Sequence, residues 1–449
     1  MTSKEVQNIY FVGIGGIGMS ALARYFVSIG KKVLGYDKTP SQITDQLEEL
    51  GVAIHFDEDV SFIQTNELTK ENTLVVFTPA VPSNHAELQY FKNHDFRVLK
   101  RAAVLGEITK HSFCLAVAGT HGKTTTSSIL GHIMTAANAT AFLGGIAENY
   151  NSNLILGGAA VSVMEADEFD RSFLQLSPNL ACITSMDADH LDIYGEHDAL
   201  LASFQDFADK VSGDIIVAKG LPIKGLTYAI DEEADYMAFN LRIENGSYRF
   251  DVQTPKTIVK NIQFHLPGRH NVMNALAAFA MADLYGVGHA QIKEKLASFA
   301  GVQRRFSYPY KSDQRILIDD YAHHPTEINA VSNAIREMYP AEKVMVVFQP
   351  HLFSRTRDFI DDFAKSLSEF DEVRLLDIYP ARELPIEGVD SDWLLEKIKN
   401  THKKLVQKSD VMDEIKTSDA KVIAMLGAGD IGVLVKEVVN ELKSEINGI

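Results

Sequence analysis

Residues 118–126 read Ala-Gly-Thr-His-Gly-Lys-Thr-Thr-Thr, and they follow an apolar run that predicts a β-strand over 114–118. Glycines let the backbone turn tightly after a strand, so that successive N–H groups point toward a phosphate. The partial positive charge at the N-terminus of a following helix adds to this attraction. Lys123 can reach β- and γ-phosphate oxygens, and the Thr124 hydroxyl can ligate Mg²⁺. The segment therefore predicts a phosphate-binding loop in an α/β domain.

The spacing of this loop, G-x-x-G-K-T, is two residues shorter than the usual G-x-x-x-x-G-K-[ST]. The departure argues against a generic nucleoside triphosphatase and favours a particular subclass. An ordinary glycine-rich turn between a strand and a helix is the alternative. The combination of glycine, lysine and three threonines after a strand disfavours that alternative.

Two acidic clusters downstream suit a metal site. The first is MEADE at residues 164–168, and the second is DADHLD at residues 187–192. Because consecutive parallel strands end at one edge of a sheet, we expect Glu165 and His190 to face the phosphates bound by the loop. Mg²⁺ prefers oxygen ligands and retains several waters, so a few protein ligands suffice. Each cluster could instead be a solvated loop with a structural histidine, and only the neighbouring phosphate loop favours the metal site.

A second glycine turn, Gly13-Ile14-Gly15-Gly16-Ile17-Gly18, lies near the N-terminus. It follows a predicted strand over 8–12, and Asp37 ends the next predicted strand, over 32–36. This pattern resembles a dinucleotide fingerprint, in which the acid binds ribose hydroxyls, and taken alone it would suggest NAD. Asp37 could equally cap a turn.

Strands alternate with helices along most of the chain, which predicts βαβ units and mainly parallel sheets. The economical interpretation is an α/β protein of three domains. Further strands are predicted at residues 73–78, 96–99, 316–318, 344–348, 373–378 and 422–426. The β-rich stretch 216–264 is expected to be an insertion or an antiparallel edge.

Composition excludes several classes of partner. The 449 residues carry 43 Lys and Arg against 60 Asp and Glu, a formal net charge of −17. So acidic a chain would repel a nucleic acid backbone or an anionic membrane surface. No apolar run reaches the roughly 18 residues that span a bilayer, and no signal peptide is evident. With only Cys114 and Cys182, a disulfide framework is not expected, and a cytoplasmic location fits.

The motifs together resemble the Mur ligase family over essentially the whole chain. Nine segments occur in the family's order: Gly13 to Gly18, GTHGKTTT at 119–126, MEADE at 164–168, DADHLD at 187–192, LPGRHNVMNALAA at 266–278, RRF at 304–306, DDYAHHPTEI at 319–328, FQPHLFSRTRD at 348–358 and LGAGDIG at 426–432. The resemblance implies three domains: a Rossmann-like domain that binds a UDP-linked substrate (1–107), a central P-loop-type ATPase domain with a mainly parallel sheet (108–303) and a Rossmann-like C-terminal domain (304–449).

The resemblance also implies roles for individual residues. ATP would be bound by Gly119, Thr120, His121, Gly122, Lys123, Thr124, Thr125, Asn271 and Asn274. The UDP-linked substrate would be bound by Gly13, Gly15, Gly16, Gly18 and Asp37. Mg²⁺ would be held by Thr124, Glu165 and His190, directly or through water. Tyr321, His323 and Arg355 would form the amino-acid site, and Lys123 and His323 would be catalytic. Tyr321 and His323 could instead be packed at a domain interface, and Arg355 could be part of a surface ion pair.

The activity implied is ATP-dependent ligation of a carboxylic acid to an amine through an acyl phosphate. The segment around His351 and Arg355 looks like that of members that add L-alanine to UDP-N-acetylmuramate. The nearest alternative is the recycling type, which joins UDP-N-acetylmuramate to a murein tripeptide. Other Mur ligases and folate-type ligases typically carry Asn where His121 stands. A monomer or weak homodimer is expected.

The sequence departs from the family pattern at two points, and two other functions are alternatives to ligation. Some relatives carry Arg where Leu352 stands, and no counterpart of the carbamylated lysine of several Mur ligases is evident between His190 and Lys210. An NAD-dependent oxidoreductase would leave the loop at 118–126 unexplained. A non-enzymatic nucleotide sensor would not need the apparently complete set of Lys123, Thr124, Glu165 and His190.

Overall fold

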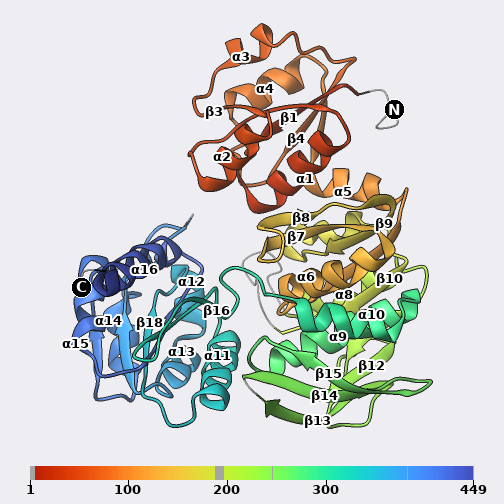
Figure 1. The fold of residues 1–449 in the computed structure, drawn as a ribbon. Helices are drawn as coiled ribbons and strands as arrows, with labels where there is room; N and C mark the ends of the chain where they lie inside the picture. Colours follow the sequence, from red (N-terminus) through yellow and green to blue (C-terminus); the bar gives the residue numbers. More distant parts are fainter. Residues whose placement is uncertain (1–5, 188–196, 245, 382, 448–449) are drawn as a thin grey trace. The chain divides into compact units, whose positions relative to one another are not determined.

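The computed structural model describes residues 6–187, 197–244, 246–381 and 383–447, and it shows an α/β protein built on three sheets (Figure 1). The prediction of an α/β fold with parallel-rich sheets is confirmed. The contacts between residues divide the chain into two compact units. One unit comprises residues 1–242, 249–264 and 273–300, and the other comprises 243–248, 265–272 and 301–449.

The first sheet has five strands in the order β3-β2-β1-β4-β5, and all its neighbouring strands are parallel. Its strands are β1 (Asn8–Val12), β2 (Lys32–Tyr36), β3 (Ala53–His55), β4 (Thr73–Phe77) and β5 (Arg97–Lys100). The helices between and after them are α1 (Ile17–Ser28), α2 (Gln42–Glu49), α3 (Val60–Thr65), α4 (Ala86–Asn93) and α5 (Arg101–Thr109). The predicted strands 8–12 and 32–36 are found with those bounds.

The second sheet has ten strands in the order β15-β14-β13-β12-β11-β10-β6-β9-β7-β8. Its strands are β6 (Phe113–Ala118), β7 (Ala139–Ala147), β8 (Ser152–Ile155), β9 (Gly158–Glu165), β10 (Leu180–Ile183), β11 (Ile215–Ala218), β12 (Leu226–Ile230), β13 (Tyr236–Glu244), β14 (Ser247–Gln253) and β15 (Ile258–Phe264). The associated helices are α6 (Lys123–Met134), η1 (Thr135–Ala137), η2 (Phe169–Gln175), α8 (His197–Ala208), α9 (Arg269–Tyr285) and α10 (His289–Ser298).

The β-rich stretch 216–264 continues this second sheet. β11 pairs in parallel with both β10 and β12, and β12 pairs in parallel with β13. The expectation of an insertion or an antiparallel edge is therefore wrong for these strands. Short strands with turn residues between them gave no signal for the direction of pairing.

The third sheet has six strands in the order β16-β17-β21-β18-β19-β20, with β16 antiparallel to β17. Its strands are β16 (Ser307–Lys311), β17 (Ile316–Asp320), β18 (Val344–Phe348), β19 (Glu372–Leu375), β20 (Lys403–Leu405) and β21 (Val422–Leu426). Its helices are α11 (Pro325–Met338), α12 (Phe353–Asp358), α13 (Ile360–Leu367), α14 (Ser391–Lys397), η3 (Lys408–Asp410), α15 (Val411–Thr417) and α16 (Ile431–Asn447).

Successive side chains along a strand point to opposite faces of the sheet. The strands of the third sheet therefore contribute to two hydrophobic clusters, one on each face. Ile318 and Val346 pack in a cluster with side chains of α11, α13 and α14. Leu317 and Met345 pack in a second cluster with side chains of α15 and α16. Covering both faces with helices explains why the strands are almost uniformly apolar.

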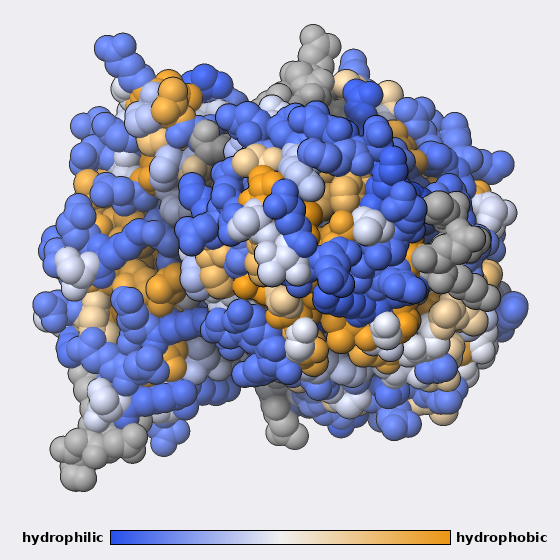
Figure 2. Space-filling model, turned by 90° about the horizontal axis from the view of Figure 1, so that it is seen from above, coloured by the Kyte–Doolittle hydropathy of each residue, from blue (hydrophilic) through white to orange (hydrophobic). Residues whose placement is uncertain are grey.

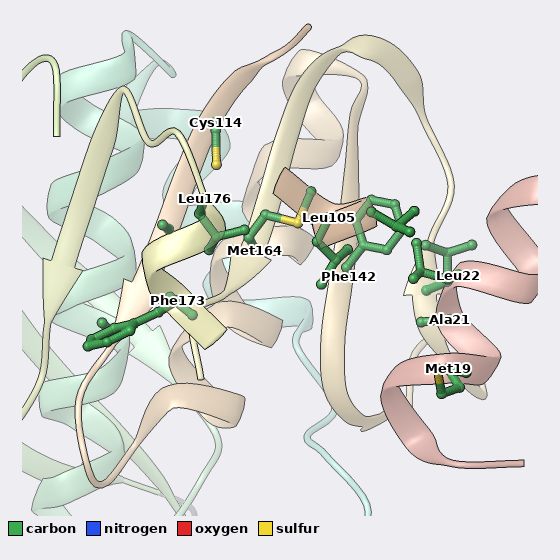
Figure 3. Packing of buried hydrophobic residues seen from close by; sticks show 14 of the residues in the cluster. Met19, Ala21, Leu22, Leu105, Cys114, Phe142, Met164, Phe173 and Leu176 are labelled. Carbon is green, nitrogen blue, oxygen red and sulfur yellow. The ribbon is translucent and has the colours of Figure 1, made fainter. Parts of the chain in front are cut away.

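A third cluster extends from α1 into the second sheet (Figure 3). Met19 and Leu22 of α1, Phe142 of β7 and Met164 of β9 belong to it. Phe173 of η2 lies in the same cluster, and its ring stacks on Phe207 with centroids 4.9 Å apart. This packing fixes the elements that carry the acidic segment after β9.

On the face seen in Figure 2, hydrophilic residues predominate and hydrophobic residues are interspersed among them. Some large apolar side chains are exposed, the most exposed being Leu384 at 85%. Within the described ranges, no helix is both long enough and apolar enough to cross a bilayer.

We predict that Phe173→Ala destabilises the first unit by about 3–5 kcal/mol, since it removes a large buried side chain and leaves a cavity. Chemical denaturation followed by far-UV circular dichroism would measure the loss. Phe113→Ala is the matched control and should cost less, because the Phe113 ring is 38% exposed. Equal losses for the two variants would contradict the assignment of Phe173 to the core.

Candidate active site

The loop after β6 has the backbone geometry that the sequence predicts for a phosphate-binding loop. Gly119 has φ +134° and Gly122 has φ +81°, values that side-chain-bearing residues rarely adopt. A Cβ at Gly119 would lie 2.1 Å from Thr184 Oγ1, and one at Gly122 would lie 2.6 Å from Asn274 Oδ1. Both positions therefore require glycine. α6 begins at Lys123, so the N-terminus of that helix faces the loop.

The end of β10 holds this loop from the side. Thr120 N donates to Ser185 O at 3.2 Å, and His121 N donates to Ser185 Oγ at 2.7 Å. Thr184 Oγ1 donates to Ala118 O at 3.1 Å. These bonds satisfy polar groups that would otherwise be unpaired, so the segment after β10 supports the loop.

Lys123 lies at the centre of a network of negative charge. Its Nζ donates to Gly119 O at 2.7 Å and to Glu168 Oε1 at 2.9 Å. The Glu168 side chain is fully buried. Burial alone would lower the pKa of Lys123, but the carboxylates of Glu168, Asp167 and Glu165 outweigh burial and raise that pKa. Lys123 therefore stays charged at neutral pH, as a ligand for phosphate must.

Thr124 and Glu165 lie together, as the strand register requires. Val117 of β6 pairs with Glu165 of β9, and Thr124 Oγ1 donates to Glu165 Oε1 at 2.9 Å. Glu165 Oε2 also accepts from Gly144 N at 2.8 Å. A hydroxyl and a carboxylate beside a phosphate loop fit Mg²⁺, which takes oxygen ligands. His190, the third predicted ligand, lies outside the described residues.

No group of three or more His, Cys, Asp or Glu side chains suited to a metal is present in the ranges that the structure covers.

Of the two asparagines predicted to contact the nucleotide, Asn274 lies directly at the loop. Its Oδ1 accepts from Thr126 Oγ1 at 3.1 Å. Asn271 is buried, and its Nδ2 donates to Pro267 O at 2.7 Å. Both belong to α9.

The N-terminal glycine turn is closed by Asp37. Gly15 N donates to Asp37 Oδ2 at 2.7 Å, and Thr39 N donates to Asp37 Oδ1 at 3.2 Å. Asp37 thus caps the turn, which is one of the two roles that the sequence left open. A Cβ at Gly18 would lie 2.2 Å from Arg101 Nη1, so the Arg101 guanidinium lies against this turn. A cation at a glycine-rich turn suits a diphosphate.

The residues predicted for the amino-acid site lie together at the carboxyl edge of the third sheet. The rings of Tyr321 and His323 are 5.4 Å apart, and those of His323 and His351 are 6.0 Å apart. Arg355 Nη1 lies 3.4 Å from His351 Nδ1, and Arg355 is only 9% exposed. The guanidiniums of Arg304 and Arg305 each lie 5.1 Å from the Tyr321 ring.

His323 is held in one orientation. Its Nδ1 lies 2.9 Å from Tyr321 O, and because a carbonyl can only accept, Nδ1 carries the hydrogen. His323 N also donates to Glu327 Oε2 at 2.9 Å. In the neutral ring Nε2 is then the basic nitrogen, which suits a proton acceptor.

A cavity of about 400 Å³ lies beyond the ends of β18, β19 and β20. Its lining includes Gln349, Tyr379, Lys408 and Asp430. Gln349 Nε2 donates to Asp430 Oδ1 at 2.8 Å, and Lys408 pairs with the same carboxylate. These polar groups satisfy one another, so the cavity identifies no ligand by itself.

Comparison with known protein families gives a match for three successive segments of the chain. Family models match residues 8–113 ("Mur ligase family, catalytic domain"), 117–282 ("Mur ligase middle domain") and 304–436 ("Mur ligase, glutamate ligase domain"). A protein of Flavobacterium johnsoniae named UDP-N-acetylmuramate–L-alanine ligase is 60% identical, with 99% of this chain and 100% of the relative covered.

The chain belongs to the Mur ligase family.

A relative of the same name from Christiangramia forsetii is 56% identical, with 98% of this chain and 99% of the relative covered. The crystal structure of the UDP-N-acetylmuramate–alanine ligase of Thermotoga maritima is 28% identical, with a TM-score of 0.82 and coverage of 98% of this chain and 99% of that one. The family assignment made from the nine motifs is confirmed.

Within this Mur ligase, the structure adds three residues to the predicted sites. Glu168 pairs with Lys123, Arg101 lies at the N-terminal glycine turn, and His351 lies beside Arg355. The segments MEADE and FQPHLFSRT contain two of these residues, so the motifs themselves could have indicated them. Arg101 lies in no motif, and only the fold brings it to the turn.

We predict that Gly119→Ala weakens ATP binding at least tenfold, because the added methyl would force the loop away from Thr184 and strain a positive φ. Gly220→Ala is the matched control, since Gly220 also has a positive φ, +93°, but has open space around it. Isothermal titration with ATP would compare the two. Equal ATP affinities would show that the close approach at Gly119 is not needed.

Proposed function

We propose that this chain is an ATP-dependent ligase that joins L-alanine to the carboxylate of UDP-N-acetylmuramate in peptidoglycan precursor synthesis. The products would be UDP-N-acetylmuramoyl-L-alanine, ADP and phosphate. The observation that carries the proposal is the full-length similarity, at 56–60% identity, to relatives named for this reaction. The phosphate loop, with the partly buried cation of Lys123, suits the chemistry that such a ligase needs.

The same similarity favours this activity over the recycling of murein tripeptide. The relatives that carry the alanine-adding name cover 98–99% of the chain at this identity. A ligase of either type would use the same loop, so the loop does not separate them. The segment around His351 and Arg355, which resembles the alanine-adding type, agrees with the relatives.

The first step would convert the carboxylate into an acylating agent. A carboxylate oxygen attacks the γ-phosphorus of ATP, the bond to the β,γ-bridging oxygen breaks, and ADP leaves. Lys123 and the loop N–H groups would stabilise charge on the transferring phosphoryl group. Mg²⁺, held by Thr124 and Glu165, would neutralise further phosphate charge when bound. The Glu165–Thr124 bond fixes the two oxygen ligands beside the loop.

The second step would form the amide. The neutral amine of L-alanine attacks the acyl carbon, and the tetrahedral intermediate expels phosphate. Arg355 would bind the alanine carboxylate, for which its planar fork of donors is suited. His323 would accept the amine proton at Nε2, since its Nδ1–H is directed to Tyr321 O.

We further propose the domain boundaries 1–107, 108–303 and 304–449, a cytoplasmic location, and a monomer or weak homodimer. Each proposed boundary lies between strands of different sheets, and the first lies within α5 (Arg101–Thr109). The two buried free cysteine thiols fit a reducing compartment.

The proposal predicts that ADP release requires Mg²⁺, ATP, UDP-N-acetylmuramate and L-alanine together. A coupled ADP assay with the purified full chain would test it, with murein tripeptide or no amine replacing L-alanine. Faster turnover with tripeptide than with L-alanine would show that the chain is a recycling ligase instead. No ADP from any mixture would contradict ligase function altogether.

Lys123→Ala should lower ADP release by about 10³-fold or more, the scale seen when a cation is removed from a transferring phosphoryl group. Lys110→Ala is the matched control, because Lys110 is an exposed lysine paired with Glu107. Circular dichroism would check that both variants fold. Near-normal turnover by Lys123→Ala would exclude Lys123 from the reaction.

A further inference from the structure

The helix that carries Arg355 is short and begins in an unfavourable conformation. α12 (Phe353–Asp358) is six residues long, and a helix of that length does not form by itself in water. Leu352 precedes it with a φ of +71°, a value that residues with a side chain rarely adopt. Leu352 also has no side-chain group that could cap the N–H groups of the first turn. The start of α12 must therefore be fixed by contacts from elsewhere in the chain.

Those contacts come from the segment after β19. Because β18 and β19 are parallel neighbours, the chain leaves both strands at the same edge of the sheet. Leu352 N donates to Tyr379 O at 3.0 Å, and Tyr379 N donates to Pro350 O at 2.8 Å. The rings of Tyr379 and His351 stack with their centroids 5.7 Å apart. The order of the strands thus brings the segment after β19 against the start of α12.

Glu383, in the same segment, supplies the cap that α12 lacks. Its Oε2 accepts from Ser354 N at 3.0 Å, and its Oε1 accepts from Ser354 Oγ. Glu383 N in turn donates to Pro380 O at 2.9 Å, which holds the backbone of Glu383 in a turn. Both carboxylate oxygens of Glu383 thus bind the residue that directly precedes Arg355.

Two other helices of the third sheet are capped by the residue that precedes them. His324, the N-cap of α11, accepts from Thr326 N, and Asp390, the N-cap of α14, accepts from Trp393 N at 2.8 Å. The cap of α12 comes instead from a residue 29 positions further along the chain than Ser354. Such a distant cap satisfies an N–H group of the first turn and also fixes the helix to another segment.

The position of Arg355 depends on this first turn. Arg355 is only 9% exposed, so its side chain is packed and follows the backbone from which it extends. Its Nη1 lies 3.4 Å from His351 Nδ1. A shift of the turn by about 1 Å would misplace the guanidinium relative to a bound carboxylate, and errors of that size weaken productive binding.

Glu383 also attracts Arg357, but more weakly. The pKa of Arg357 is raised first by its bond to Asp358 and to a smaller extent by Glu383. The Arg357 side chain is 51% exposed, so water screens this attraction. The bonds from Ser354 to the carboxylate are charge-assisted and direct, and they are therefore the main contacts of Glu383.

We propose that Glu383 is a positioning residue of the amino-acid site: by binding Ser354, it fixes the first turn of α12 so that Arg355 can bind the carboxylate of L-alanine. This inference deepens the proposed function and rests on it. Glu383 acts through Ser354 and Arg355 and touches no reacting atom.

Steady-state kinetics of the full chain, followed as ADP release, test this role. Glu383→Ala should raise the KM for L-alanine about tenfold, because hydrogen bonds to a charged group are lost. The kcat and the KM values for ATP and UDP-N-acetylmuramate should stay nearly constant. Glu383→Gln should recover most of the loss, because its amide can accept from Ser354 N and donate to Ser354 Oγ. In an Arg355→Lys background, Glu383→Ala should add little, since Glu383 acts through Arg355.

Glu387→Ala is the matched control, because Glu387 is exposed and lies in the same segment between β19 and α14. It should have the KM values of the wild type.

Three outcomes would overturn the inference and leave the proposed function intact. One is a wild-type KM for L-alanine in Glu383→Ala. Another is equal impairment of Glu383→Gln and Glu383→Ala, which would show that the charge of Glu383 matters and its bonds to Ser354 do not. The third is an equal rise of the KM values for all three substrates, which would indicate a structural effect. If the wild type released no ADP with L-alanine, the proposed function would fail, and the inference with it.

Discussion

The arrangement of the central site depends on a partly buried ammonium group, that of Lys123, and on the negative charge that surrounds it. Lys123 can occupy its position only because Glu168 and the carbonyl of Gly119 compensate its charge where water is largely excluded. The phosphates of ATP carry charge of the same sign as Glu168. On the proposed function, Lys123 would exchange Glu168 for a phosphate of ATP as its anionic partner. Burying a carboxylate is costly for folding, and burial accordingly raises the pKa of Glu168 although Lys123 lies beside it.

The two glycine turns are each held in place by a residue from a neighbouring strand end, but the residue differs. A tight turn leaves backbone N–H groups directed toward a ligand, and the chain on either side must be fixed by other bonds. Ser185, after β10, binds the loop at His121, whereas Asp37, after β2, binds the turn at Gly15. In each case the support comes from the end of the adjacent parallel strand. The order of strands in a sheet thus decides which residue can support a turn, and the sequence of the turn alone does not.

Much of the fold could be predicted because its strands are apolar runs bounded by glycine or acidic residues. β1, β2, β18 and β21 have the predicted bounds. The stretch 216–264 was harder, since short strands with half-buried faces carry no information on whether their neighbours run parallel. Among the site residues, Lys123, Thr124 and Glu165 could be predicted because they lie in motifs whose residue types and spacing suit phosphate and metal binding. Arg101 has no such spacing, and only the folded chain shows that its guanidinium lies against Gly18.

Leu352 shows how a residue without functional groups can still set the geometry of a site. It stands where some relatives carry Arg, it is 6% exposed, and its φ is +71°, which is strained for a residue with a side chain. Its N–H donates to Tyr379 O at 3.0 Å, and its carbonyl accepts from Thr356 Oγ1 at 2.8 Å in the first turn of α12. Leu352 is therefore held between Tyr379, in the segment after β19, and α12, and it joins His351 to the helix that carries Arg355. Since Leu352 offers no charge, Arg355 would be the cation of this segment that binds the alanine carboxylate on the proposed function.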